Sequence, residues 1–194
     1  MPLDPSIKAG IVTQIPKTIK PEVEKQFKQA FESIKNRMVL DFLNHPITQE
    51  IKAGPNSSNI SGTLGGGSGN LFSFIGFESN SDPTNEIEKL LLSTSFRFLK
   101  LGNKSVDFTI YLPSAKEIFS VTPMPWASGR SWARGIETGI SGLGYYLLKE
   151  SDSSRSGLGI QSPRRVRKKS KFKNTQYISA LIKKYEKEFK NLQL

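Results

Sequence analysis

The stretch that decides the fold is residues 21–43, PEVEKQFKQAFESIKNRMVLDFL. Its large apolar side chains recur at steps of three or four residues, which places them along one face of an α-helix. These side chains are Val23, Phe27, Phe31, Ile34, Met38 and Phe42. Pro21 suits the first position of a helix, and the dipeptide His45-Pro46 predicts its end. The sequence therefore predicts a helix over 21–43, about 35 Å long, with one apolar face.

A second amphipathic helix is predicted over residues 176–194, with Asn174 or Thr175 as its N-cap. Apolar side chains again fall on one face, and lysines dominate the other. The apolar set is Ile178, Leu181, Ile182, Tyr185, Phe189 and Leu192. Two such faces need a common apolar surface to cover, and the segments between the helices must supply it.

Those intervening segments predict strands and short helices. Residues 96–101 and 105–112 flank Gly102-Asn103, a pair suited to the tight turn of a β-hairpin. Further strands are expected at 71–77, with Gly76 as a bulge, and at 131–138, 143–150 and 157–161.

Two short helices complete the middle of the chain. Asp82-Pro83 predicts the start of a helix through Leu91, and Ser114 and Glu117 have the spacing of a capping box. The fold class is therefore α+β, with a long N-terminal helix and a C-terminal helix packed on a twisted antiparallel sheet.

The domain organisation follows from composition. Residues 1–20 carry Pro2, Pro5 and Pro16 and predict an extended arm. Residues 21–194 predict one α+β domain, which contains a mobile, glycine-rich loop at 53–70 and a basic loop at 162–175. Ordering glycines is entropically expensive, and the side chains of 57–70 offer little to bury, so we expect this loop to order against a neighbouring subunit.

Residue usage argues against most catalytic chemistry. The chain of 194 residues has no cysteine and one histidine, His45. Thiolate catalysis and the usual zinc ligand sets are thereby excluded, and a histidine before a proline at a helix end is expected to be structural. No catalytic residue, cofactor or metal site is predicted. No apolar run approaches the roughly 20 residues that span a bilayer, and the N-terminal residues do not have the pattern of a secretory signal.

The glycine cluster at residues 62–69 invites comparison with phosphate-binding loops. It lacks the Gly-Lys-Ser/Thr ending, and apolar residues follow it where a phosphate loop would open a helix. We interpret it as a flexible loop or an assembly arm.

Positive charge is concentrated in residues 164–173, RRVRKKSKFK. Lysine and arginine number 28 against 17 acidic residues, a net charge of +11, and seven of these positive charges lie in this run. Like charges at this density must be solvated or face an anion. The alternatives are a solubilising loop without a partner, or contact with nucleic acid, an acidic protein surface or a membrane surface. We expect contact with nucleic acid or an acidic partner through Arg164, Arg165, Arg167, Lys168, Lys169, Lys171 and Lys173.

A second candidate surface is the segment 124–139, MPWASGRSWARGIETG. Trp126, Arg130, Trp132 and Arg134 interleave aromatic and guanidinium groups, which are frequent in binding hot spots and can stack on bases. The competing interpretation places both tryptophans in the core with the arginines at the surface. We expect one buried tryptophan and arginines at an interface.

The order of these elements resembles the neck or tail-completion proteins, the head–tail connectors of tailed bacteriophages. Proteins of that group have a long N-terminal helix, a glycine-rich loop, a twisted antiparallel sheet with a Glu-Thr-Gly-like turn, and a closing helix. The matching parts here are residues 21–43, 61–70, Glu137-Thr138-Gly139 and 176–194, with the N-terminal arm and the basic run as additions.

The resemblance implies a non-enzymatic subunit of a homo-oligomeric ring in the virion. Such a ring assembles in the host cytoplasm, docks the connector to the tail and surrounds DNA in its lumen, without a cofactor or a membrane. Two other classes remain open. One is a basic RNA- or DNA-binding accessory protein, which a monomeric state with high affinity for RNA would favour. The other is an enzyme acting on an anionic substrate, which would need acids converging on His45.

Overall fold

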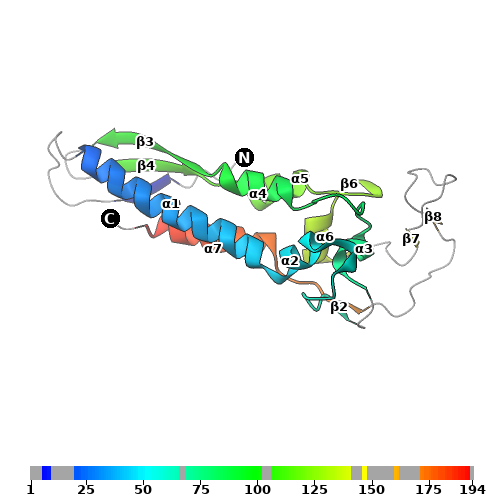
Figure 1. Cartoon of the computed structure of the whole chain (residues 1–194). Helices are drawn as coiled ribbons and strands as arrows, with labels where there is room; N and C mark the ends of the chain where they lie inside the picture. Colours follow the sequence, from blue (N-terminus) through cyan, green and yellow to red (C-terminus); the bar gives the residue numbers. More distant parts are fainter. Residues whose placement is uncertain are drawn as a thin grey trace. The chain divides into compact units, whose positions relative to one another are not determined.

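The computed structural model describes residues 6–9, 20–65, 69–101, 106–140, 146–147, 160–161 and 171–192, and Figure 1 shows their elements. Helices and small antiparallel sheets alternate along these residues, so the fold is α+β. The structure divides into two compact units. Unit 1 comprises Met1–Phe42, Glu88–Glu117 and Ser179–Leu194, and unit 2 comprises Leu43–Ile87 and Ile118–Ile178. Each unit joins segments distant in sequence.

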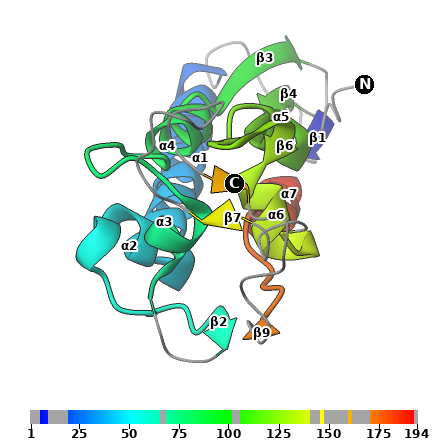
Figure 2. The same ribbon diagram turned by 90° about the vertical axis from the view of Figure 1, so that its right-hand side faces the viewer.

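Unit 1 contains the two long helices and a three-stranded antiparallel sheet. Helix α1 spans Lys20–Asn44, apart from its last two residues within this unit, and α7 spans Ile178–Lys190. The strands are β1 (Ser6–Ala9), β3 (Ser95–Leu101) and β4 (Val106–Tyr111), in the order β1-β4-β3. Figure 2 shows β1 and β3 on either side of β4.

Aromatic rings fill the core of unit 1. The ring of Phe27 stacks on that of Phe108, with centroids 3.7 Å apart, which fixes α1 against β4. Phe31, one turn along α1, lies 4.9 Å from Phe96 on β3 and 5.4 Å from Phe189 on α7. The apolar stripe of α1 therefore meets both the sheet and α7.

Two local predictions in this region are confirmed. Strands β3 and β4 pair as an antiparallel hairpin, with a register shift between Phe98 and Lys100. The capping box is present, because Ser114 Oγ accepts from the backbone N–H of Glu117 at 3.2 Å and the Glu117 carboxylate accepts from the backbone N–H of Ser114 at 2.7 Å. It precedes helix α5 (Ala115–Ser120), and its hydrogen bonds hold the pKa of Glu117 below its usual value.

Unit 2 is built from short elements. Its helices are α2 (Pro46–Lys52), η1 (Gly54–Asn56), α3 (Leu71–Ile75) and α6 (Trp132–Thr138). Two-stranded antiparallel ladders join β2 (Leu64–Gly65) to β9 (Lys171–Phe172), β5 (Pro123–Met124) to β6 (Ala127–Ser131), and β7 (Tyr146–Leu147) to β8 (Ile160–Gln161). The core of unit 2 is centred on Trp132, whose ring lies 5.5 Å from Phe77 and 6.4 Å from Tyr177.

The strand predicted at 71–77 is wrong, because these residues form helix α3. The side chain of Asn70 caps the helix by accepting from the backbone N–H of Ser73 at 2.9 Å. Gly76, with φ 92°, ends it, and the backbone N–H groups of Gly76 and Phe77 both donate to the Phe72 carbonyl. A left-handed glycine that closes a helix in this way is a helix stop, where the sequence suggested a strand bulge.

The strand predicted at 131–138 is also wrong. Strand β6 ends at Ser131, and helix α6 begins at Trp132. Ser131 Oγ accepts from the backbone N–H of Arg134 at 3.1 Å, which makes Ser131 an N-cap. Of the strands predicted at 143–150 and 157–161, the described residues are 146–147 and 160–161, which pair as β7 and β8.

Helix boundaries differ from those predicted at two further places. Asp82 accepts from the N–H and hydroxyl of Thr84, and helix α4 (Asn85–Leu92) therefore begins beyond the Asp82-Pro83 pair. At α7, the backbone N–H of Thr175 donates to Ile136 in unit 2, and the helix begins at Ile178.

Candidate functional site

The C-terminal end of the basic run contacts other segments of unit 2. Strand β9 pairs with β2, the ring of Phe172 stacks on Phe74 at 5.7 Å, and the backbone N–H of Lys173 donates to Thr63 at 2.9 Å. Figure 2 shows β2 and β9 side by side. Lys173 is exposed. The other predicted contact residues, apart from the backbone of Lys171, lie outside the described residues: Arg164, Arg165, Arg167, Lys168 and Lys169.

The glycine-rich segment reaches the same ladder, since Leu64 and Gly65 form β2. Two asparagine side chains form hydrogen bonds within the segment. Asn59 donates to the Leu64 carbonyl at 2.7 Å, and Asn70 donates to the carbonyls of Pro55 and Ser57, each at 2.8 Å. Thr63, Leu64 and Asn70 are buried. The expectation that this segment has little to bury is therefore wrong, although residues 66–68 lie outside the described part of the chain.

A buried carboxylate organises this region. Glu50, on α2, is fully buried, and its two oxygens accept from the backbone N–H groups of Ser61 and Leu71, each at 2.7 Å. Charge-assisted hydrogen bonds of this length are strong and directional. Glu50 thereby joins α2 to the residues on either side of the glycine cluster at 62–69. Sequence reasoning missed it because nothing in the pattern of α2 distinguishes this acid from a surface one.

The segment 124–139, which contains the tryptophans and arginines, has some of these side chains at the surface and others in the core. Trp126 is half-buried and donates from Nε1 to the Ile75 carbonyl at 2.7 Å. Arg130 and Arg134 are exposed. Trp132 is buried, with only 1% of the residue accessible, so it is the one tryptophan that the sequence analysis expects in the core, and it does not belong to the surface set. The surface set is therefore Trp126, Arg130 and Arg134.

His45 acts as a helix cap. Its Nδ1 accepts from the backbone N–H of Ile47 at 3.3 Å, at the start of α2, and its ring lies 4.9 Å from that of Tyr177. Burial lowers the pKa of His45. Tyr177 in turn shares a 2.7 Å hydrogen bond with the Thr48 hydroxyl, and burial raises the pKa of Tyr177. These contacts give His45 a structural role.

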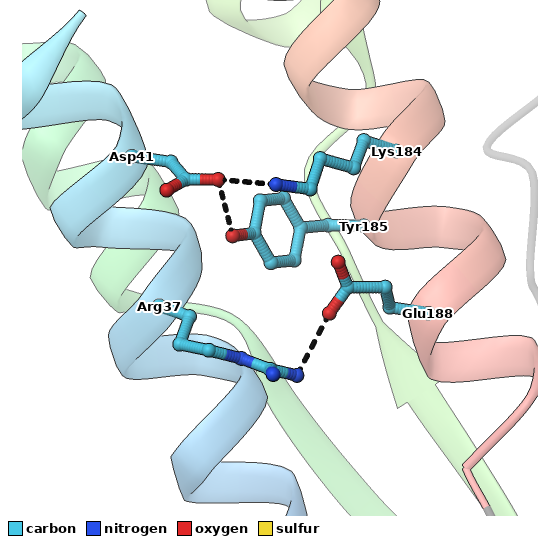
Figure 3. A network of polar contacts seen from close by, with 5 residues as sticks. All are labelled: Arg37, Asp41, Lys184, Tyr185 and Glu188. Atoms are coloured by element: carbon cyan, nitrogen blue, oxygen red, sulfur yellow. Dashed lines mark hydrogen bonds and ion pairs between the residues drawn. The ribbon is translucent and has the colours of Figure 1, made fainter.

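A polar network and a shallow groove lie between α1 and α7 in unit 1. Figure 3 shows one carboxylate oxygen of Asp41 accepting from Lys184 Nζ and from the Tyr185 hydroxyl, each at 2.6 Å, and Arg37 pairing with Glu188 at 2.8 Å. The lining of the groove is mixed apolar and polar, and its volume is ≈ 480 Å³. The lining residues are Ala30, Ser33, Ile34, Arg37, Lys187, Glu188, Asn191 and Leu192.

Among the residues that line the groove, Glu188 alone carries a carboxylate, and it is engaged by Arg37. Across the described ranges no cluster of three or more His, Cys, Asp or Glu side chains has the geometry of a metal site. None of the described helices combines the length and apolarity needed to cross a bilayer.

Comparisons with known proteins return no relative. No family model, no curated protein and no solved structure matches the chain.

Proposed function

We propose that the protein is a non-catalytic structural subunit of a ring at the head–tail junction of a tailed bacteriophage. The body of the subunit is the pair α1 and α7 packed on a twisted sheet, and residues 164–173 contact DNA in the lumen or an acidic partner subunit. The ring belongs to the virion neck, is assembled in the host cytoplasm, and docks the connector to the tail.

The observation that carries this proposal is the concentration of charge. Seven cations in ten residues account for most of the net charge of +11. Rotational symmetry would repeat the run around a ring and so form a continuous basic belt. Such a belt suits a polyanion or an acidic ring, because neutralising many phosphates or carboxylates together gains more than one isolated pair.

The anchoring of the run supports the same proposal. Strand β9 and the hydrogen bond from Lys173 to Thr63 hold one end of the run against unit 2. These contacts fix the position of Lys173, the last cation of the run, on the subunit. The exposed Arg130 and Arg134, with the half-buried Trp126, provide a separate surface for a neighbouring subunit.

The binding test measures affinity for duplex DNA as a function of salt. If all seven cations met phosphates, log affinity would fall against log salt with a slope of roughly −6. Replacing Arg164, Arg165, Arg167 and Lys168 with Gln should weaken binding and reduce the slope, with thermal stability unchanged. A matched control replaces four exposed lysines outside the run with Gln and so removes the same amount of positive charge. These lysines are Lys25, Lys28, Lys89 and Lys116.

The outcomes separate the possible partners. Equal weakening by both quadruple variants would show that net charge, and not the run, determines binding. Absence of DNA binding, with binding to an acidic partner subunit that the run variant abolishes, would assign the run to protein contact. A large fall in stability of the run variant would instead make the run structural.

The assembly test is the native mass of the full chain. A ring gives a closed multiple of 21.6 kDa. Deleting residues 1–17 should leave a folded monomer that no longer assembles. A full-length monomer with high affinity for RNA would favour the accessory-protein class, and turnover of a substrate through His45 would contradict the structural proposal.

A further inference from the structure

Strand β1 is a short element that completes the sheet of unit 1 from outside the hairpin. It pairs antiparallel with β4, with Ser6 opposite Thr109, Ile7 opposite Phe108, Lys8 opposite Asp107 and Ala9 opposite Val106. Because β3 occupies the other side of β4, β1 is what makes β4 a central strand. The four residues of β1 lie within the predicted arm.

Strand β1 covers this edge of β4. Phe108 and Ile110 are buried, and Thr109 is 4% accessible. Without β1, this edge of β4 would present a row of unpaired N–H and C=O groups beside the aromatic core. The segment that pairs with this edge therefore supplies the hydrogen-bond partners for the backbone of β4.

The segment that fills the edge does not have to come from the same chain. Ten residues, 10–19, separate β1 from the start of α1, and a linker of this length spans at most roughly 36 Å. The ladder is formed by backbone groups, so the β1 segment of an identical chain satisfies it equally well. Exchange of an identical element between protomers is a low-cost route to assembly.

We propose that, in the assembled protein, β1 of each subunit adds to β4 of a neighbouring copy in the register Lys8 opposite Asp107. This proposal rests on the proposed ring, for which it identifies the contact. Head-to-tail donation of a strand uses two different patches on each subunit, the donated β1 and the accepting edge of β4. Such a contact closes into a ring when the rotation between neighbours allows it.

The test uses engineered disulfides, because the chain has no cysteine of its own. Two pairs are made: Lys8→Cys with Asp107→Cys, and Ala9→Cys with Val106→Cys. They occupy consecutive rungs of the antiparallel ladder, so one of them is the closely spaced, non-hydrogen-bonded type. The Cα atoms of a non-hydrogen-bonded pair are about 4.5 Å apart, a separation that a disulfide can bridge.

The two halves of each pair are placed on separate chains, which are mixed, refolded together, oxidised and run on a non-reducing gel. We expect a covalent heterodimer of two 21.6 kDa chains, formed roughly tenfold more than with the control pair Lys8→Cys and Glu78→Cys, which are not opposite in the ladder. Each single variant alone measures background coupling. With both cysteines on one chain, exchange should give a series of covalent oligomers.

The failures of the two proposals are distinguishable. A native mass that shows an oligomer, with only intrachain disulfides in both double variants, would overturn strand exchange and leave the ring intact. A chain that stays monomeric at all concentrations and forms no heterodimer would overturn both. If one pair of substitutions prevents folding, as judged from the thermal melt of the reduced protein, the other pair decides.

Discussion

At the scale of single residues, the one histidine makes stability depend on pH. His45 caps α2 through Nδ1, and burial lowers its pKa from the usual 6.5. The unfolded chain therefore takes up a proton before the folded chain does, so the stabilisation is complete above pH 6.5 and is lost as pH falls below it. We expect a loss of about 1 kcal/mol in the free energy of unfolding, the typical value of an N-cap.

Urea denaturation between pH 5 and 8 measures this effect. The substitution His45→Asn keeps an N-cap acceptor but removes the titration, so its unfolding free energy should be flat across that range. The substitution His45→Ala should be flat as well, but lower throughout. A slope that persists in both variants would assign the pH dependence to another group.

Glu50 gives a second prediction at this scale. Its oxygens accept from the part-buried backbone N–H of Ser61 and the buried backbone N–H of Leu71. An amide can accept at only one end, so Glu50→Gln should leave one N–H without an acceptor and lower the unfolding free energy by roughly 1–3 kcal/mol. Glu78→Gln, an exposed acid in the same unit, is the matched control and should change it by less than about 0.5 kcal/mol. Equal urea midpoints for the two variants would contradict this role.

At the scale of elements, we expect the Tyr185 hydroxyl to contribute more to the pairing of α1 with α7 than the ion pairs do. The Asp41 carboxylate binds Lys184 and Tyr185, and its hydrogen bonds with these two residues lower the pKa of Asp41. The Lys184 side chain is 54% accessible, whereas Tyr185 is buried. We expect Tyr185→Phe to cost about 1 kcal/mol and Lys184→Gln about 0.5 kcal/mol or less.

A double-mutant cycle between Asp41→Asn and Tyr185→Phe measures the coupling directly, with Lys183→Gln as a control on the exposed face of α7. High salt should reduce the effect of Lys184→Gln but leave that of Tyr185→Phe. Additive effects of Asp41→Asn and Tyr185→Phe would show that the hydrogen bond between them contributes nothing.

At the scale of the whole molecule, unit 1 needs segments from both ends of the chain. Helix α7 supplies the buried Phe189 and Tyr185, and Phe189 contacts Phe31 of α1. Deleting residues 178–194 should therefore abolish the cooperative thermal transition and expose apolar surface that binds a hydrophobic dye. Deleting residues 1–17 should leave a cooperative transition. A sharp melt of the chain without α7 would show that the rest of unit 1 folds without it.

Short-range patterns were readable from the sequence wherever a few neighbouring residues decide the structure. The helix predicted at 21–43 lies within α1, the hairpin of β3 and β4 is present, and Ser114 and Glu117 form the expected capping box. Apolar spacing and capping are properties of adjacent residues. The basic run can likewise be recognised from the sequence, but the sequence does not identify the partner that it contacts.

Only the tertiary structure decided the rest. Residues 71–75 are mostly apolar, so periodicity could not separate strand from helix, and whether Gly76 closes a helix or forms a strand bulge depended on its left-handed backbone, which the sequence does not show. Strands of two residues, as in β2 and β9, are too short to carry a pattern, and their pairing joins segments about a hundred residues apart. The roles of Trp132 in the core and of Glu50 beneath the glycine-rich segment depend on which distant groups surround them, and a linear pattern does not contain that information.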